Sequence, residues 1–480
     1  MNKVVGQVGL AWVPWSVAFQ IATAIFLLSW IVYQRYLSPF ARIPGPYWAS
    51  ITRLWLTWHS YKGDLHLIMI NLHEVHGKVV RIAPSEVYDK DAVKLMTDVG
   101  AGSKFRKSDW YSVWQGRRKF DLFAERNEAI HAAQRRLVSR PYAMSTLKEL
   151  EPYVDNAIVV LFDKLKYMVG QTVDMGTWAQ LYAFDVIGEI TFSKRFGFMD
   201  VGSDDGSFKQ IEDALISAAW IGQVPWLYWL HDYLSPVIGN WLGITSRHGS
   251  LRQFAAREVT ARQDRGSDHQ DILGKLLSVH HEKPDQFDNA SIVSMATSNI
   301  FAGSDTTAIS IRAIIYHILK NPESKRLLLE EINEFWQQGK LSDPVTVAET
   351  EKMPYLQAVM YEALRLHPAV GMTLPRVVPK GGYQVDGHFM PAGSVVGVNP
   401  WVVHRNTDVY GHDVHSFRPE RWLKENNGDM HRFFFAFGSG ARMCIGRNIS
   451  WMEMSKLIPT LFMKFELELA DYTAPLEEKC

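Results

Sequence analysis

Apolar residues run almost without interruption from residue 8 to residue 33, and no charged residue occurs between Lys3 and Arg35. Folded as a helix, this run would be about 39 Å long, which is enough to cross a bilayer core of about 30 Å. We therefore expect residues 1–35 to form a membrane anchor. A cleaved signal peptide is the alternative. Against it, the run is longer than a usual signal core and no small-residue cleavage site closes it.

Basic residues flank the apolar run unequally. Only Lys3 precedes it, whereas three arginines follow it by residue 53. Because positive residues favour the cytosolic side of a membrane, we expect the body of the protein on that side. The sequence IPGP at residues 43–46 then breaks the helix. Proline and glycine there predict a stiff hinge over residues 36–50.

Helical periodicity dominates the rest of the chain. Apolar residues recur at three- and four-residue spacing or fill whole segments, as in helices packed around a core. The expected helices cover residues 65–75, 91–96, 128–138, 149–165, 178–191, 208–219, 288–319, 322–338 and a segment that begins at residue 354. Strand-like stretches are confined to residues 79–88 and 381–398, and a polar stretch at 263–270 predicts a loop. The pattern predicts a mainly α fold with a minor β region, with residues 51–480 forming one body.

Composition narrows the function classes. Lys plus Arg equals Asp plus Glu at 51 each, so overall charge does not favour a nucleic-acid or acidic ligand. The 17 tryptophans suit an apolar pocket or a membrane interface. Only Cys444 and Cys480 are cysteines, which argues against a disulfide framework and for a reducing compartment.

The strongest chemical signal is the stretch FGSGARMCIG at residues 437–446. The thiolate of Cys444 could serve as the protein ligand of a haem iron. Glycines on both sides allow a tight turn and a close approach to a flat ring. A helix is expected to begin just after Cys444, and its N-terminus favours a thiolate. The guanidinium of Arg442 matches a carboxylate, and a haem carries two propionates.

These residues form a family signature. The pattern Phe437-x-x-Gly440-x-Arg442-x-Cys444-x-Gly446 resembles the haem-binding motif of the cytochrome P-450 superfamily of haem-thiolate monooxygenases. The resemblance implies the helical fold of that family. It also implies haem b with Cys444 as its axial ligand.

A second motif matches the oxygen-activating helix of the family. Residues 302–307 read AGSDTT inside the long apolar segment 288–319, where such polar residues are locally unfavourable. The resemblance implies a local widening of this helix, with the Thr306 hydroxyl and the Asp305 carboxyl delivering protons. The alternative, in which Thr306 and Thr307 merely bond carbonyls one turn earlier, is expected for Thr307 and not for the whole set.

Other motifs concern haem binding and the core. His131 and Arg135 lie four apart on one helix face and match a family position that contacts a propionate. Arg376 lies where family members reach a propionate. A solvated basic face is the alternative for the first pair. Charged residues of the matching Glu-x-x-Arg motif and its distal arginine are expected to hold the core together: Glu362, Arg365 and Arg421.

Pocket residues follow from the resemblance as well. The candidates that line the substrate pocket are Trp110, Tyr111, Trp114, Phe301, Ala302, Val370, Met372 and Leu374. For the aromatic residues among residues 105–126, pinning a surface loop is an equal alternative. The uncharged stretch 214–230 resembles the lid over the substrate channel, and contact with the membrane is open there.

The implied reaction inserts one oxygen atom of O₂ into an apolar small molecule, with electrons from NADPH through a membrane-bound reductase. Basic residues near the proximal face, Arg136, Arg140 and Arg447, are candidates for meeting that reductase. The expected location is the endoplasmic reticulum membrane, as a single-pass protein. Segments such as VVRIAPSEV and FRPERWL resemble fungal microsomal members of secondary metabolism, near the pisatin demethylase-like group.

Two other classes remain open from the sequence. A haem-thiolate isomerase or dehydratase would need Cys444 but no proton relay, and the pair Asp305–Thr306 argues against it. A catalytically impaired haem protein is the other class. Its support is the short chain after the last expected helix, since residues 464–480 leave little room for the hairpin that usually completes the pocket.

Overall fold

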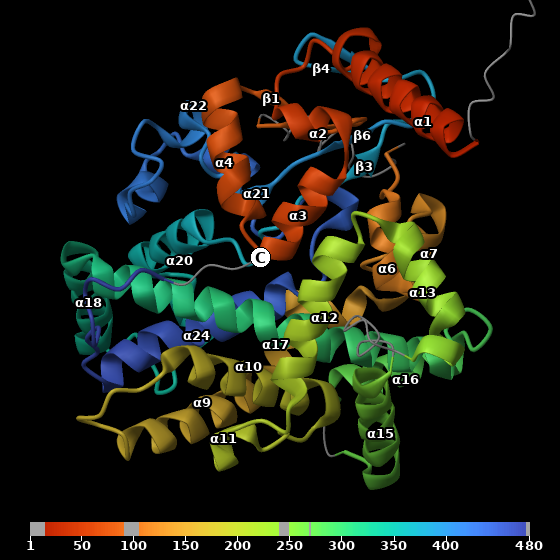
Figure 1. Ribbon diagram of the computed structural model, residues 1–480. Coiled ribbons are helices and arrows are strands. Elements are labelled where there is room, and N and C mark those ends of the chain that lie inside the picture. Colours follow the sequence, from red (N-terminus) through yellow and green to blue (C-terminus); the bar gives the residue numbers. More distant parts are fainter. Residues whose placement is uncertain (1–14, 91–104, 240–248, 268–269, 477–480) are drawn as a thin grey trace, which may run out of the picture.

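The computed structural model describes residues 15–90, 105–239, 249–267 and 270–476, and its helices form most of the molecule (Figure 1). The helices are α1 Trp15–Val32, α2 Tyr47–Ile51, α3 Leu54–Lys62, α4 Leu65–His76, α6 Ser112–Gln115, α7 Glu128–Val138, α8 Met144–Leu147, α9 Glu151–Lys166, α10 Met175–Phe192, α11 Phe198–Val201, α12 Ser207–Ile221, α13 Pro225–Ile238, α15 Ser250–Arg265, α16 Ile272–Glu282, α17 Asn289–Lys320, α18 Pro322–Gln337, α19 Val347–Thr350, α20 Pro354–Leu366, α21 Pro400–Val403, α22 Thr407–Tyr410, α23 Gly428–Phe433 and α24 Arg447–Lys464.

The helix α17 crosses the middle of the molecule, with α10 and α9 beneath it and α24 alongside (Figure 1). Its N-terminus is fixed by Asp288, whose carboxylate accepts from the Ser291 amide at 2.8 Å, as in a standard N-cap. Its apolar face packs into one large core. The mainly α prediction is confirmed.

The strands lie on the other side of α17, close to α1–α4. Four of them form one sheet in the order β1 (Val79–Ala83), β2 (Glu86–Asp89), β6 (Val395–Gly397) and β3 (Arg376–Val377). Pairing is antiparallel between β1 and β2, parallel between β2 and β6, and antiparallel between β6 and β3. A separate hairpin joins β4 (Tyr383–Val385) to β5 (His388–Met390). The two predicted strand regions are therefore confirmed.

The predicted loop at 263–270 is wrong at its start, because α15 continues to Arg265. Gly266 caps the helix, and its φ of 73° favours glycine. Polarity there reflects an exposed helical face. The predicted helix at residues 91–96 lies outside the described residues.

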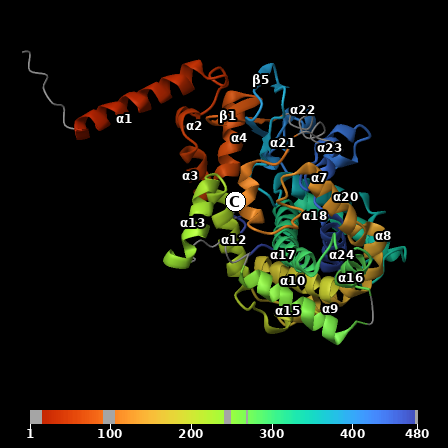
Figure 2. The same ribbon diagram turned by 90° about the vertical axis from the view of Figure 1, so that its right-hand side faces the viewer.

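The N-terminal helix projects away from the body (Figure 2). The segment Trp15–Leu37 has a mean hydropathy of 1.8 over its most apolar window and is unburied there, so it is long and apolar enough to cross a membrane. Its last turn, Tyr33–Leu37, is a π-turn. A candidate membrane anchor is thus present.

The segment after the anchor is packed onto the sheet. The buried Arg81 of β1 donates to the Gln34 carbonyl at 2.8 Å and to the Gln34 side-chain oxygen at 2.7 Å. The side chains of Phe40 and Ile43 are buried beside it. The stretch predicted as a hinge therefore holds the end of the anchor helix against the body.

Candidate functional site

The loop before α24 presents Cys444 to an internal space. Gly438 and Gly440 take φ of 71° and 61°, which other residues adopt rarely, and these turns bring the Cys444 amide within 2.9 Å of the Phe437 carbonyl. The Cys444 side chain is exposed although protein surrounds its loop, as expected for a group on the wall of a cavity.

Two opposing effects act on the pKa of the Cys444 thiol. Burial raises the pKa of the thiol, whereas amides of Gly446 and Arg447 and the charges of Arg135 and Arg447 lower it, and burial prevails. The helix N-terminus alone therefore does not produce a thiolate. A bound metal cation would reverse this balance, because a coordinating thiol is deprotonated.

The AGSDTT stretch lies on α17. Ala302 is exposed between the buried side chains of Phe301 and Ser304, so this part of α17 also borders open space. The Thr306 hydroxyl donates to the Ala302 carbonyl at 2.8 Å, and Thr307 instead shares a hydrogen bond of 2.8 Å with Ser450 of α24. The prediction for Thr307 is therefore wrong, because its hydroxyl bonds to Ser450 of α24, and it is Thr306 that bonds the carbonyl one turn earlier.

The expected widening of this helix is also wrong. The segment Asn289–Lys320 is α-helical throughout. The Thr306 hydroxyl can instead engage the Ala302 carbonyl without a change of helical pitch.

Asp305 faces α10 and not the thiol loop. Its carboxylate accepts from the Gln180 amide at 3.3 Å. Burial raises the pKa of Asp305 to about 6, with Arg312 opposing the rise and Glu212 adding to it. An acid with this pKa can hold and release a proton near neutral pH.

Cations gather at one edge of the same space. Arg442 binds Glu128 through two hydrogen bonds of 3.0 and 2.7 Å, which leaves its Nη1 without a partner. Arg376 is 4% exposed, and its Nε and Nη1 have no partner in the described part of the chain. Burial, together with the charges of Arg442, Lys107 and Arg135, lowers the pKa of His131 to about 3.

This cluster fits a dianionic group. A buried guanidinium cannot shed its proton, so Arg376 without an acidic partner is costly. The two propionates of a haem would supply the missing charge, next to a cysteine that can bind its iron. The residues present therefore fit haem b. Arg135 differs from the expectation in one respect, since its Nη1 donates to the Met443 carbonyl at 2.8 Å and so braces the thiol loop.

One member of this cluster, Lys107, was not predicted from the sequence, and another, Tyr111, was predicted in a different place. Lys107 forms a β-bridge with Arg376, and its ammonium lies 4.1 Å from the centre of the Tyr111 ring. The Tyr111 hydroxyl is buried without a partner, and the Arg376 guanidinium lies 5.8 Å from the ring centre. Tyr111, expected in the substrate pocket, thus lies with the cations. No local spacing marks Lys107, because its neighbours come from distant parts of the chain.

The motif arginines form a complete ion network. Glu362 binds Arg365 through two hydrogen bonds of 2.8 Å and Arg421 at 3.0 Å. Its remaining partners are the Trp422 indole at 2.8 Å and the Arg418 amide at 2.9 Å. All three motif residues are fully buried or nearly so. They lie apart from the cation cluster and support the core.

His404 connects this network to the thiol loop and was not predicted. One ring nitrogen lies 3.0 Å from the Arg365 carbonyl, and the other accepts from the Phe435 amide at 2.7 Å. Burial, then the Arg365 charge, lowers the pKa of His404 to about 3, so the ring is neutral. A neutral ring can donate on one side and accept on the other.

The other predicted pocket residues differ in their burial and in the elements that they contact. Trp114 and Phe301 pack together with ring centres 6.2 Å apart, and Trp110 donates to the Ala219 carbonyl of α12 at 3.3 Å. Val370 is 38% exposed, and Met372 is almost buried. The Leu374 amide bonds the Val398 carbonyl and its side chain packs beside the sheet core.

Comparison with known proteins gives a consistent result. The family model described as Cytochrome P450 matches residues 43–479. Cytochrome P450 monooxygenase hepC of Aspergillus oryzae is 41% identical, covering 94% of this chain and 92% of the relative. Cytochrome P450 monooxygenase gsfF of Penicillium aethiopicum is 35% identical over 93% and 92%. A pisatin demethylase of Fusarium vanettenii is 35% identical over 95% and 89%. The chain therefore belongs to the cytochrome P450 family of haem-thiolate monooxygenases.

Proposed function

We propose that this chain oxidises an apolar small molecule of fungal secondary metabolism, with haem b bound through Cys444. The single observation that carries the cofactor assignment is the buried guanidinium of Arg376, two nitrogens of which have no hydrogen-bond partner among the described residues, and the exposed Cys444 supplies the iron ligand. Arg442, His131, Gly440, Gly446 and Phe437 complete the site as the residues that shape or charge its walls. When bound, the haem supplies activation of O₂ and insertion of one oxygen atom into a C–H bond.

The protein side of this reaction is proton handling. Thr306 lies at the exposed stretch of α17, where its hydroxyl can donate a hydrogen bond to a bound ligand or water once it leaves the Ala302 carbonyl. Asp305 is the nearest residue along α17 with a proton to give, and Gln180 holds its carboxyl toward the α10 side. General acid assistance of this kind is worth about 10²–10⁴ in rate.

Apolar walls define the substrate class. Trp114 packs against Phe301, which precedes the exposed Ala302 on α17, and Met372 and Val370 are proposed to add further carbon surface. Such walls exclude water and bind by burial of apolar area, at roughly 25 cal/mol per Å². This supports an apolar substrate. The secondary-metabolism assignment rests on likeness to the fungal monooxygenases.

Electrons are proposed to come from NADPH through a membrane-bound reductase. Arg136 and Arg140 are exposed and the half-buried Arg447 follows the thiol loop, and their positive charge suits an acidic partner. Such docking would weaken with salt.

The proposed location is the endoplasmic reticulum membrane, with the body in the cytosol. Supporting it, the helices α2, α3 and α13 lie on the same side of the molecule as α1 (Figure 2), and they carry exposed aromatic side chains. Among them are Trp48, Trp58, Tyr61, Trp226 and Tyr233, each at least 57% exposed. Tryptophan and tyrosine favour the membrane interface.

The test is the difference spectrum of the reduced protein with and without carbon monoxide. We expect a Soret band strongly red-shifted from that of a His-ligated haem, and its loss in Cys444→Ser. A His-like band in the unaltered protein would contradict the thiolate assignment. Substrate-dependent consumption of NADPH separates a monooxygenase from an isomerase or dehydratase, which needs no reductant.

A further inference from the structure

A second cavity lies between the thiol loop, α20 and α23. Its volume is about 310 Å³, and its walls come from α20, α23, the thiol loop and the first residue of α24. The lining residues are Tyr361, His431, Arg432, Phe434, Phe437, Gly438, Ser439, Met443 and Arg447. No acidic side chain is among them.

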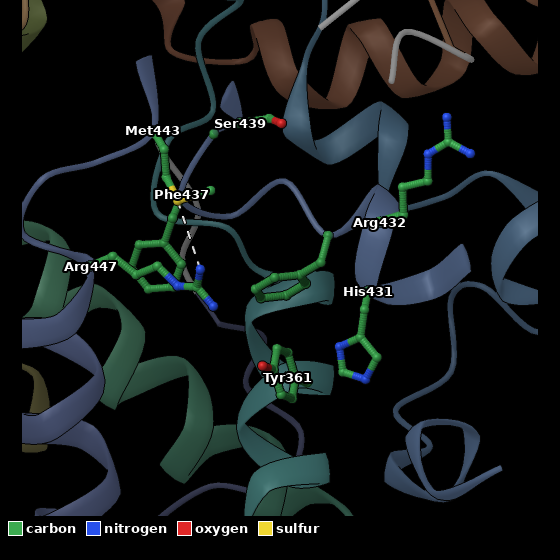
Figure 3. A pocket seen from close by; sticks show the side chains of 9 residues that line it. Tyr361, His431, Arg432, Phe437, Ser439, Met443 and Arg447 are labelled. Atoms are coloured by element: carbon green, nitrogen blue, oxygen red, sulfur yellow. Dashed lines mark hydrogen bonds between the residues drawn. The ribbon is translucent and has the colours of Figure 1, made fainter. Parts of the chain in front are cut away.

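One positive charge points into this cavity. Figure 3 shows the Arg447 side chain reaching in beside Phe437 and above Tyr361, whereas Arg432 turns away. Within the described residues, the hydrogen-bond partner of the Arg447 guanidinium is the Met443 sulfur at 3.8 Å, which is a weak acceptor. Burial lowers the pKa of His431, so that ring is neutral at pH 7. The half-buried Arg447 therefore has no carboxylate partner among the described residues.

The walls are flat and rigid. The Tyr361 ring packs edge-on against Phe434 and His431, with centres 4.9 Å apart in both pairs, and stacks on Trp422 at 5.1 Å. The Arg447 guanidinium lies 5.9 Å from the centre of the Phe437 ring. Rings fixed in this way favour a planar apolar body by stacking, while the guanidinium matches a carboxylate in two parallel bonds.

We propose that this cavity binds a small aromatic carboxylate, with the carboxylate on Arg447 and the ring among Tyr361, Phe434 and Phe437. A carboxylate could also come from an acidic side chain of a docked protein. Cavities of at least 300 Å³ hold small molecules, and a single glutamate side chain would leave most of the aromatic wall bare, which favours a free ligand.

Occupancy would affect the thiol loop. Arg447 follows Cys444 by three residues, and its guanidinium lies 3.8 Å from the sulfur of the adjacent Met443, so an anion bound there would weaken the positive field at the thiol loop. A weaker positive field disfavours addition of an electron, so the midpoint potential of the haem should fall. By linkage, reduction should weaken binding of the anion by the same factor. This coupling rests on the proposed function, whereas the binding itself does not.

The experiment titrates the purified haem-containing full chain with 2-naphthoate by calorimetry, with 2-naphthamide as the uncharged probe. We expect one site, with affinity at least tenfold weaker for the amide and for Arg447→Met, because a charge-assisted hydrogen bond is lost. Arg432→Met is the matched control and should bind like the unaltered chain. Arg447→Lys keeps the charge and should retain part of the affinity. In a redox titration, naphthoate should make the midpoint potential more negative.

Three results would overturn the proposal. Equal binding by Arg447→Met places the ligand elsewhere. A naphthoate-induced Soret shift that an apolar substrate analogue competes away assigns the ligand to the haem-side pocket. No binding of naphthoate, together with slower reduction of Arg447→Met by a reductase, assigns the carboxylate to the protein partner. If naphthoate binds through Arg447 but the potential stays unchanged, the coupling fails while the proposed monooxygenase chemistry is untouched.

Discussion

Two groups of buried arginines differ in one respect, the completeness of their partners. In the core network, Arg365 and Arg421 donate to Glu362 and to backbone carbonyls of residues 404–416, and every guanidinium nitrogen is used. In the cation cluster, Arg442 has one unpaired nitrogen and Arg376 has at least two. The first group is fully paired within the protein, whereas the second has nitrogen atoms that can bind an anion.

The difference is informative because a guanidinium keeps its proton. Glu453 also has both carboxylate oxygens buried without a partner, but burial raises its pKa well above the usual range, so it becomes neutral. An unpaired buried carboxyl can thus lower the energetic cost of its burial by binding a proton. Arg376 cannot lose its proton in this way, and no carboxylate of the described residues forms an ion pair with it, so a bound anion would lower the cost of its burial.

The core network should give the largest effect. Glu362→Ala leaves the buried Arg365 without a carboxylate partner and leaves Arg421 with Asp413 alone, which costs about 3–5 kcal/mol of the free energy of unfolding. Chemical denaturation of the haem-free chain measures this directly, since the network involves no haem contact. Exposed Glu425→Ala is the matched control and should change stability little. A loss seen only in the haem-bound form would contradict the structural role of Glu362.

Arg376→Met should weaken haem binding without lowering the stability of the haem-free chain, unlike Glu362→Ala. Without haem, removal of an unpaired buried charge should leave the unfolding free energy unchanged or higher. With haem, loss of charge-assisted hydrogen bonds should cost about 1.5–3 kcal/mol, or about ten- to hundredfold faster haem loss. Transfer of haem to an excess of apomyoglobin measures the rate. Unchanged haem retention in this variant would refute its place in the haem site.

The same contrast explains what sequence could predict. Glu362 and Arg365 lie three apart on one helix, so their pairing follows from local geometry, as do the bounds of α7 and the N-cap of α17. The partners of Thr307 depend on how α24 packs against α17, which no local pattern contains. Lys107 meets Arg376 only through a β-bridge between distant segments. These contacts arise from tertiary packing, so they could not be predicted from the sequence around each residue.

Asp305 extends the comparison to a carboxyl with a single amide partner. Its pKa of about 6 means that the neutral, proton-bearing form declines as pH rises through 6. The fraction of NADPH that yields product should fall over the same interval. Asp305→Asn should remove this dependence and lower coupled turnover by about tenfold to a hundredfold.

A neighbouring charge sharpens that test. Glu212 raises the pKa of Asp305, so Glu212→Gln should move the midpoint of the profile to lower pH without reducing turnover at its optimum. Steady-state product and NADPH measurements from pH 5 to pH 8 give both profiles. An identical midpoint in the two proteins would show that the titrating group is not Asp305.

The smallest effect is expected at Lys107. Burial and the charges of Arg376 and Arg442 hold its pKa well below the usual range, and its ammonium already contacts the Phe123 carbonyl and two aromatic rings. Lys107→Met should therefore change haem loss by less than about tenfold, less than Arg376→Met.

Lys107 differs from Arg376 because its side chain can gain or lose a proton. Propionates nearby would raise the lowered pKa of Lys107, so haem binding should take up a proton at pH values between the pKa of the haem-free and haem-bound forms. Calorimetry in buffers of different ionisation enthalpy counts that proton. We expect Lys107→Met to abolish the uptake and Arg376→Met to alter it, because Arg376 is one of the charges that hold the pKa of Lys107 down. If the uptake persists undiminished without Lys107, the proton belongs to another group, with His131 the first to examine because its pKa is also lowered by this cluster.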